Sequence, residues 1–213
     1  STSSLDNSGR GDGFFVEGAQ FRGYVSNGYA GVGVSGVGDV NGDGIDDIIV
    51  GAFGGEIFGP PEVGETYVAF GSDAGFGARI DLDNLNGANG FALSGIAEQD
   101  LSGASVANAG DVNGDGLDDI IIGAQRADRG STPGTGQSYV VFGSTTGSGA
   151  NLPLATLDGT NGFSLSGVNP NEFSGTTVAS AGDINGDGFD DVIIGTEFGF
   201  LGGDSYGVVG SGD

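Results

Sequence analysis

A nine-residue acidic segment occurs three times in the chain and carries the residue types that bind a hard metal ion. The first copy, 39–47, reads DVNGDGIDD, and the copies at 111–119 and 183–191 start 72 residues further on each time. Positions 1, 3, 5 and 9 offer side-chain oxygens and position 7 offers a backbone carbonyl; in the first copy these are Asp39, Asn41, Asp43, Asp47 and Ile45. Ca²⁺ favours about six to eight oxygen ligands in flexible geometry, so the sequence predicts one calcium ion in each of the three copies.

The segments around each copy predict a β-hairpin rather than the two helices of an EF-hand. An EF-hand loop needs a glutamate at position 12, where this chain has Val50. The flanking runs 32–37 and 48–50 are short, rich in β-branched residues and bounded by glycine, which is typical of strands. An ordinary hairpin turn with incidental acids is the alternative, but three copies with four aspartates each favour a metal loop at the hairpin tip.

The composition favours an extracellular β protein. Glycine makes up 48 of 213 residues, yet hydrophobic residues still reach 37%, which fits short strands joined by tight turns. The net charge of −24 would repel nucleic acid and anionic membranes, and no apolar segment approaches the roughly 18 residues of a membrane span. The absence of cysteine and lysine, with this acidity, fits a bacterial extracellular protein, secreted or at the cell surface. Ser1 at the start indicates a processed or excised chain.

The sequence repeat extends well beyond the metal loops and supplies four short strands per unit. A D strand (GFxLxG) is expected at 13–18, 90–95 and 162–167, and an A strand before each metal loop at 31–38, 103–110 and 175–182. A B strand follows each loop at 48–50, 120–122 and 192–194, and a C strand (xYVxFG) at 66–71, 138–143 and 205–210. Repeated units of four antiparallel strands are typical of β-propeller blades. The chain is therefore expected to be one all-β module, 1–213, with repeats at about 13–84, 90–157 and 162–213.

Three blades are too few for a closed ring, because propellers carry about four to eight. The first D strand, 13–18, precedes every A strand and would act as a closing strand for a blade whose other strands come from elsewhere. It would pair with the C strand at 205–210, within one chain or between chains. We expect a homodimer with six blades, a larger parent chain, or an open fibre of copies.

The repeats resemble the FG-GAP repeats of the integrin α-subunit propeller and their bacterial relatives. The FG element is Phe70-Gly71 and Phe142-Gly143, weakening to Val209-Gly210, and the GAP element is 51–53, 123–125 and 195–197, without its proline. The resemblance implies calcium ligation and a role in adhesion. It implies three ligand sets, the first as given above, the second Asp111, Asn113, Asp115, Leu117 (carbonyl) and Asp119, and the third Asp183, Asn185, Asp187, Phe189 (carbonyl) and Asp191. The position 8 aspartates, Asp46, Asp118 and Asp190, are expected outside the ligand set.

A ligand-binding face is expected opposite the calcium loops. Successive turns of an up-and-down sheet alternate between its two ends, so the B–C and D–A loops should lie together at the end away from the metal. These loops vary between repeats and carry aromatic residues and arginines, which are favoured at binding hot spots. The candidates are Phe21, Arg22, Tyr24, Tyr29, Phe53, Phe58, Arg126, Arg129, Phe198 and Phe200. The alternative is that the phenylalanines pack against neighbouring blades.

These observations predict a calcium-binding adhesion, protein-interaction or surface-assembly module. The alternatives are a glycan-binding module, such as a lectin or an accessory domain of a carbohydrate-active enzyme, and a structural subunit of a surface layer or filament. An enzyme is not expected, because histidine, cysteine and lysine are absent. Glu56 and Glu62 could form a glycosidase-like pair, but the other repeats carry no counterpart.

Overall fold

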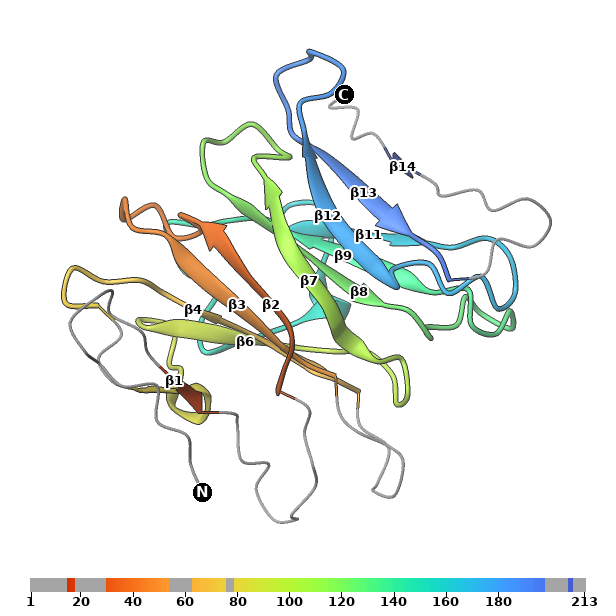
Figure 1. The fold of residues 1–213 in the computed structure, drawn as a ribbon, viewed down its shortest axis with the longest axis horizontal. Helices are drawn as coiled ribbons and strands as arrows, with labels where there is room; N and C mark the ends of the chain where they lie inside the picture. Colours follow the sequence, from red (N-terminus) through yellow and green to blue (C-terminus); the bar gives the residue numbers. More distant parts are fainter. Residues whose placement is uncertain (1–14, 18–29, 54–62, 76–78, 198–206, 209–213) are drawn as a thin grey trace.

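A computed structural model describes residues 15–17, 30–53, 63–75, 79–197 and 207–208, and they form an all-β structure (Figure 1). The strands of the first sheet region are β1 (Phe15–Glu17), β2 (Ala30–Gly38), β3 (Asp47–Ala52), β4 (Glu65–Ala69), β5 (Arg79–Asp81) and β6 (Gly90–Ser94). They are followed by β7 (Ser102–Gly110), β8 (Asp119–Ala124), β9 (Gln137–Val141), β10 (Asn151–Pro153), β11 (Gly162–Ser166), β12 (Thr177–Gly182), β13 (Asp191–Gly195) and β14 (Gly207–Val208). Two 3₁₀ turns lie at Leu82–Asn84 and Leu154–Thr156, and no helix among the described residues is long enough to cross a membrane.

The strands assemble into antiparallel sheets in the order expected for each repeat. The first sheet runs β2-β3-β4-β6 and the second runs β7-β8-β9-β11, so each D strand completes the A, B and C strands that precede it in sequence. The described part of the third sheet is β12-β13-β14. The three A strands, β2, β7 and β12, run side by side across the molecule (Figure 1). Sheets containing these four strands are therefore found for the first two repeats, whereas their arrangement as propeller blades and closure into a ring stay predictions.

Alternation along the central strands creates the cores between sheets. In β8, Ile120 and Ile122 pack into a core shared with the first repeat, whereas Ile121 packs into a core shared with the third. All three side chains are fully buried, because successive strand residues point to opposite faces and both faces of this sheet are covered. Each such burial stabilises the fold by about 1.5–3 kcal/mol, so packing between repeats is a major source of stability.

Two short parallel strands were not expected from the sequence. β10 pairs in parallel with β6, at the outer edge of the first sheet, and β5 pairs in parallel with β1. The segment after each C strand thus lies beside a D strand of the preceding unit. β1 takes the place of such a D strand, as its sequence indicates. Its partner among the described strands is β5, and β14 pairs with β13, so the described residues do not show the predicted pairing of 13–18 with 205–210.

Candidate calcium loops and the contacts between repeats

The aspartate at position 1 organises each loop from the inside. In the first loop, Asp39 Oδ1 accepts hydrogen bonds from the amides of Gly42 (2.7 Å) and Asp43 (3.0 Å), and Oδ2 accepts one from Gly44 (2.8 Å). Gly44 has φ +86°, a left-handed conformation that a residue with a Cβ rarely adopts. Asp111 and Asp183 make the same three hydrogen bonds in their own loops. The three loops therefore share one backbone path.

The side chains at positions 3 and 5 converge with that aspartate. Asn41 Nδ2 lies 3.1 Å from Asp43 Oδ2, and Asn41 Oδ1 accepts from the Asp43 amide at 2.8 Å. Asp43 Oδ1 in turn accepts from the Ile45 amide. The second loop has the same contacts. This set of hard oxygens within one tight turn fits Ca²⁺, although no three His, Cys, Asp or Glu side chains in the described structure group closely enough to hold a metal by themselves.

The aspartate at position 9 is tied to backbone amides. Asp47 is buried at the base of the loop, where Oδ2 accepts from the Val40 amide (3.1 Å) and Oδ1 accepts from the Gly71 amide (2.8 Å). The carboxylate of Asp119 accepts hydrogen bonds from the amides of Val112 and Gly143 in the same way. This carboxylate therefore links the loop to the glycine of the FG element. Calcium coordination by this carboxylate stays a prediction. Each of its oxygens keeps a lone pair that no amide uses and that could bind the ion.

Burial changes the acidity of the position 9 aspartates. It raises the pKa of Asp47 to about 6 and that of Asp119 to about 7, although the two backbone amides on each carboxylate oppose the shift. The negative charges at positions 1 and 5 of the same loop raise both pKa values further. A bound cation would act in the opposite direction, because it favours the ionised carboxylate.

The aspartate at position 8 joins one repeat to the one before it. Asp118 Oδ2 accepts from the amide of Asp39 at 2.9 Å, and the Asp118 amide donates to the Asp39 carbonyl at 3.2 Å. Asp190 makes the same pair of bonds to Asp111, at 2.9 and 3.0 Å. The expectation that position 8 lies outside the metal ligands agrees with this role, which the sequence did not reveal. The sequence signal that could have indicated this role is the aspartate that recurs at position 8 in all three loops.

Replacing Asp118 with alanine is expected to destabilise the folded protein by about 1.5–3 kcal/mol, because the hydrogen bonds that it makes involve a charged acceptor. The change removes acceptors for the Asp39 amide and for Asn108 Nδ2. Urea unfolding in calcium measures the loss. Asp73→Ala removes the same charge from an exposed turn and is the matched control. Equal midpoints for the two variants would contradict the role assigned to Asp118.

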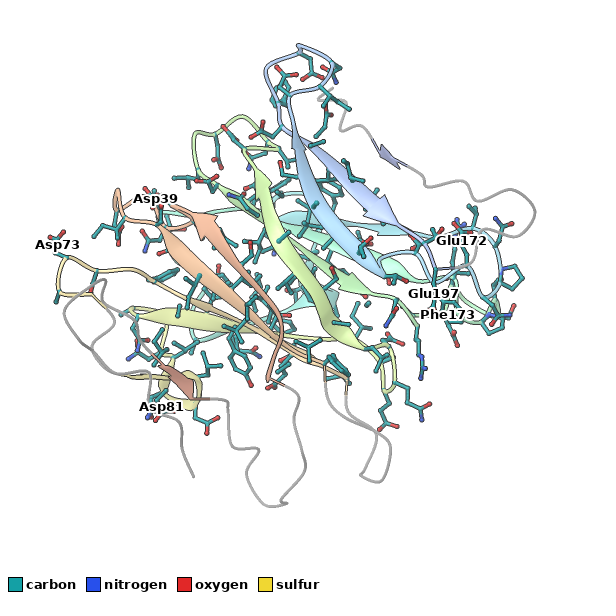
Figure 2. The ribbon with its side chains drawn as sticks, in the orientation of Figure 1. Asp39, Asp73, Asp81, Glu172, Phe173 and Glu197 are labelled. Atoms are coloured by element: carbon teal, nitrogen blue, oxygen red, sulfur yellow. The ribbon has the colours of Figure 1, made fainter. Side chains whose placement is uncertain are left out.

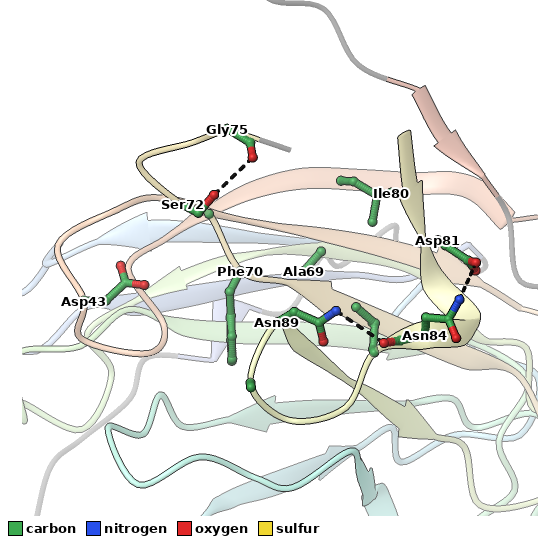
Figure 3. Close-up of a pocket in the computed structure, with 12 residues that line it drawn as sticks. Asp43, Ala69, Phe70, Ser72, Gly75, Ile80, Asp81, Asn84 and Asn89 are labelled. Carbon is green, nitrogen blue, oxygen red and sulfur yellow. Dashed lines mark hydrogen bonds between the residues drawn. The ribbon is translucent and has the colours of Figure 1, made fainter. Parts of the chain in front are cut away.

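Each of the first two loops borders a small open cavity. The first, of about 330 Å³, lies between Asp43, the FG turn at 70–72 and the turn at 84–89 (Figure 3). The second, of about 270 Å³, is lined by the equivalent residues, among them Asp115, Phe142 and Asn161. The position 5 carboxylate thus lies beside a solvent-open space in both repeats, so a cation held there would have a path to solvent.

The B–C and D–A loops lie together, as the turn alternation predicts. The Arg126 amide donates to the Asp100 carbonyl at 3.1 Å, and the Asn171 amide donates to the Pro133 carbonyl at 2.9 Å. Figure 2 shows Glu172 and Phe173 at this end, with Asp39 at the other.

Three of the ten candidate ligand residues are described. Arg126 and Arg129 are exposed, and Phe53 is half-buried. The remaining candidates fall outside the described residues: Phe21, Arg22, Tyr24, Tyr29, Phe58, Phe198 and Phe200. Their place on this face therefore stays a prediction.

A buried acid in each of the two described D–A loops escaped notice in the sequence. Asp100 and Glu172 occupy equivalent positions and are 8% and 4% exposed. The residues beside Glu172, Asn171 and Phe173, have φ of 56° and 54°, and the two neighbours of Asp100 are also left-handed. Glu172 Oε2 accepts from the Asn169 amide at 2.7 Å, so the acid holds its own loop in this strained shape. Their 72-residue spacing was the signal that could have found them.

Comparison with known proteins agrees with these structural repeats. The FG-GAP repeat model matches residues 102–141 and 174–211, and repeats of this family commonly bind Ca²⁺. Phosphatidylinositol-glycan-specific phospholipase D of Bos taurus is 35% identical over 171 residues, which cover 80% of this chain and 19% of that protein. The Homo sapiens protein of that name is 33% identical over the same shares. Integrin alpha-5 of Xenopus laevis is 33% identical over 122 residues, covering 54% of this chain and 11% of the integrin.

The chain spans about a fifth of the length of the phospholipase D relatives that it matches. The similarity lies in the repeats. There the amide of the FG glycine donates to the position 9 aspartate, and the GAP glycine packs against the next repeat. The chain therefore carries FG-GAP repeats and is a distant homologue of the corresponding regions of phosphatidylinositol-glycan-specific phospholipase D and the integrin alpha subunits.

Proposed function

We propose that this chain is a calcium-binding β-propeller module of an extracellular protein, and that it binds a partner protein in adhesion or surface assembly without catalysing a reaction. The observation that carries the calcium part is the threefold recurrence of one loop structure, with the position 1 carboxylate gathering three amides each time. Homology to integrin alpha subunits supports the adhesive part. The shared orientation of the B–C and D–A loops, with exposed Arg126 and Arg129, supports a binding face away from the metal.

Calcium titration is expected to give about three ions per chain, with dissociation constants of roughly 10⁻³ M or tighter, the range of extracellular modules. Isothermal calorimetry on metal-free protein measures the stoichiometry. Asp111→Ala should remove one ion, because it deletes the carboxylate around which the second loop turns. Asp73→Ala, on an exposed turn, should leave the stoichiometry unchanged. Failure of the wild-type protein to bind calcium would overturn the calcium part of the proposal.

The binding face is tested by comparing protein and glycan ligands under the same conditions. Immobilised chain in calcium would be screened against surface proteins and a glycan array, using wild type, Arg126→Ala, Arg129→Ala and Asp73→Ala. Retention of a protein that is lost with either arginine change, but not with Asp73→Ala, supports the proposal. Retention of glycans alone would instead support a lectin-like module. Turnover of any array glycan would contradict the non-catalytic assignment.

A further inference from the structure

Neighbouring calcium loops contact each other directly. A Cβ on Gly42, at position 4 of the first loop, would lie 3.1 Å from Leu117 Cδ2, and one on Gly114 in the second loop would lie 2.5 Å from the ring of Phe189. Leu117 and Phe189 occupy position 7 of the next loop along the chain, where the backbone carbonyl is a predicted calcium ligand. The glycine turn of one loop therefore packs against a predicted ligand residue of the following loop.

The position 8 aspartate connects the two loops a second time, through hydrogen bonds. Asp118 accepts from the Asp39 amide and donates its own amide to the Asp39 carbonyl, so both bonds fix the backbone of the residue that organises the first loop. In sequence Asp118 lies between Leu117 and Asp119, two predicted ligands of the second loop. The third loop holds the second through the same pair of bonds.

The position 9 carboxylates of the first two loops are connected through the backbone. Asp47 Oδ2 accepts from the Val40 amide, and the Val40 carbonyl accepts from the Ser144 amide at 2.9 Å. The residue before Ser144 is Gly143, whose amide donates to Asp119 Oδ1 at 2.9 Å. A shift of either carboxylate would therefore be felt at the other through a short series of hydrogen bonds.

We propose that the calcium sites of neighbouring repeats fill cooperatively, and that Asp118 and Asp190 are the positioning residues that couple them. The inference rests on the calcium binding proposed above. Ordering of Leu117 and Asp119 in the second loop would fix Asp118 between them. Asp118 would then hold the Asp39 backbone in place for the first loop. Such coupling is reciprocal, so filling either loop raises the calcium affinity of the other by the same factor, commonly about 5–150-fold.

Repulsion between ions in neighbouring loops opposes this coupling. The half-buried carboxylate of Asp118 lies on the contact between the first two loops, and that of Asp190 lies on the contact between the second and third. Each places a negative charge where it offsets part of the repulsion, and salt screens exposed charges that lie further apart than about 8–10 Å. Positive rather than negative cooperativity is therefore expected.

Calcium titration of the metal-free full chain, followed with a calcium-selective electrode, measures the cooperativity. Wild type is expected to show a Hill coefficient well above one, with the number of sites as its upper limit. The double variant Asp118→Ala, Asp190→Ala should bind as many ions as wild type, because neither residue is a predicted ligand, but with a Hill coefficient near one. The control, Asp73→Ala with Asp158→Ala, removes the same charge from two exposed turns and should behave as wild type.

The possible results separate this inference from the proposed function. Wild type that binds calcium with a Hill coefficient of one or below would overturn the coupling and leave the calcium binding intact, whereas no binding at all would overturn both. Equal Hill coefficients for the two double variants would also contradict the coupling, because cooperativity would then come from folding of the whole chain. Circular dichroism in calcium verifies that both variants fold.

A further variant tests the coupling without a change at position 8. Asp115→Ala removes a predicted ligand from the second loop and leaves every predicted ligand of the first and third loops in place. The ions that remain should bind about fivefold or more weakly than those of wild type. Asp158→Ala, on an exposed turn, is the control for the loss of one charge. Wild-type affinity at the remaining sites would show that the loops bind independently and would refute the proposal.

Discussion

Removal of calcium is expected to lower the melting temperature by roughly 10–30 °C. An ion at about 10–100 times its dissociation constant stabilises the folded state by about 1.4–2.7 kcal/mol, so three sites contribute roughly 4–8 kcal/mol. For a domain of this size, 1 kcal/mol shifts the melting temperature by about 2–4 °C. The chain has 29 acidic residues against five arginines, so few cations are present to replace the lost metal charge.

The measurement is thermal unfolding followed by circular dichroism in about 10 mM CaCl₂, in the same concentration of MgCl₂, and in excess EDTA. Mg²⁺ requires near-octahedral geometry and keeps several of its waters, so it should restore only part of the stability. The triple variant Asp39→Ala, Asp111→Ala, Asp183→Ala should lose the calcium response altogether. Identical melting temperatures for wild type in all three solutions would show that the loops fold without an ion.

Gly123→Val is expected to destabilise the protein by about 3 kcal/mol or more, at or above the usual upper end for overpacking a core. A Cβ at Gly123 would lie 2.1 Å from the carbonyl oxygen of Gly175, and one at Gly51 would lie 1.9 Å from that of Gly103. Neither side of this contact can move freely. Gly123 lies within β8, paired on both sides, and the Gly175 amide donates to Gly195 in the third repeat.

Urea unfolding in calcium measures this effect, and Gly36→Val is the matched control. Gly36 lies in β2, and a Cβ there has no heavy atom within 4 Å. Valine at that position should change the midpoint little. If Gly123→Val and Gly36→Val had similar midpoints, the close approach of the repeats would not be the reason for glycine in the GAP element.

The strands and loops could be predicted because their signals lie within a few residues. The run of three β-branched isoleucines at 120–122 predicts a B strand, and β8 extends over it. The oxygen-bearing positions of the loop likewise predicted the turn that Asp39 organises. Recurrence at a 72-residue spacing then allowed each weak local signal to be read three times.

The sequence could not reveal roles that depend on partners far along the chain. Asp118 and Asp119 are adjacent and chemically identical, yet one binds the preceding repeat and the other binds the FG glycine of its own repeat. Their difference arises because the loop 79 residues earlier in the chain packs against Asp118. The parallel strand β10 was missed for the same reason, because three residues carry no periodic signal and its partner β6 lies far earlier in the chain, with Asn151 paired to Ala92.

The bond from the position 8 aspartate has a consequence for how such a chain can lengthen over evolution. The donor in one loop and the acceptor in the next are separated by 79 residues in both instances, which is one repeat plus the seven residues from position 1 to position 8. A gene duplication of one whole repeat therefore supplies a new donor together with its acceptor, whichever point in the unit is chosen as the boundary. A duplication that includes only part of a repeat can separate the two, so selection on folding favours duplication of whole repeats.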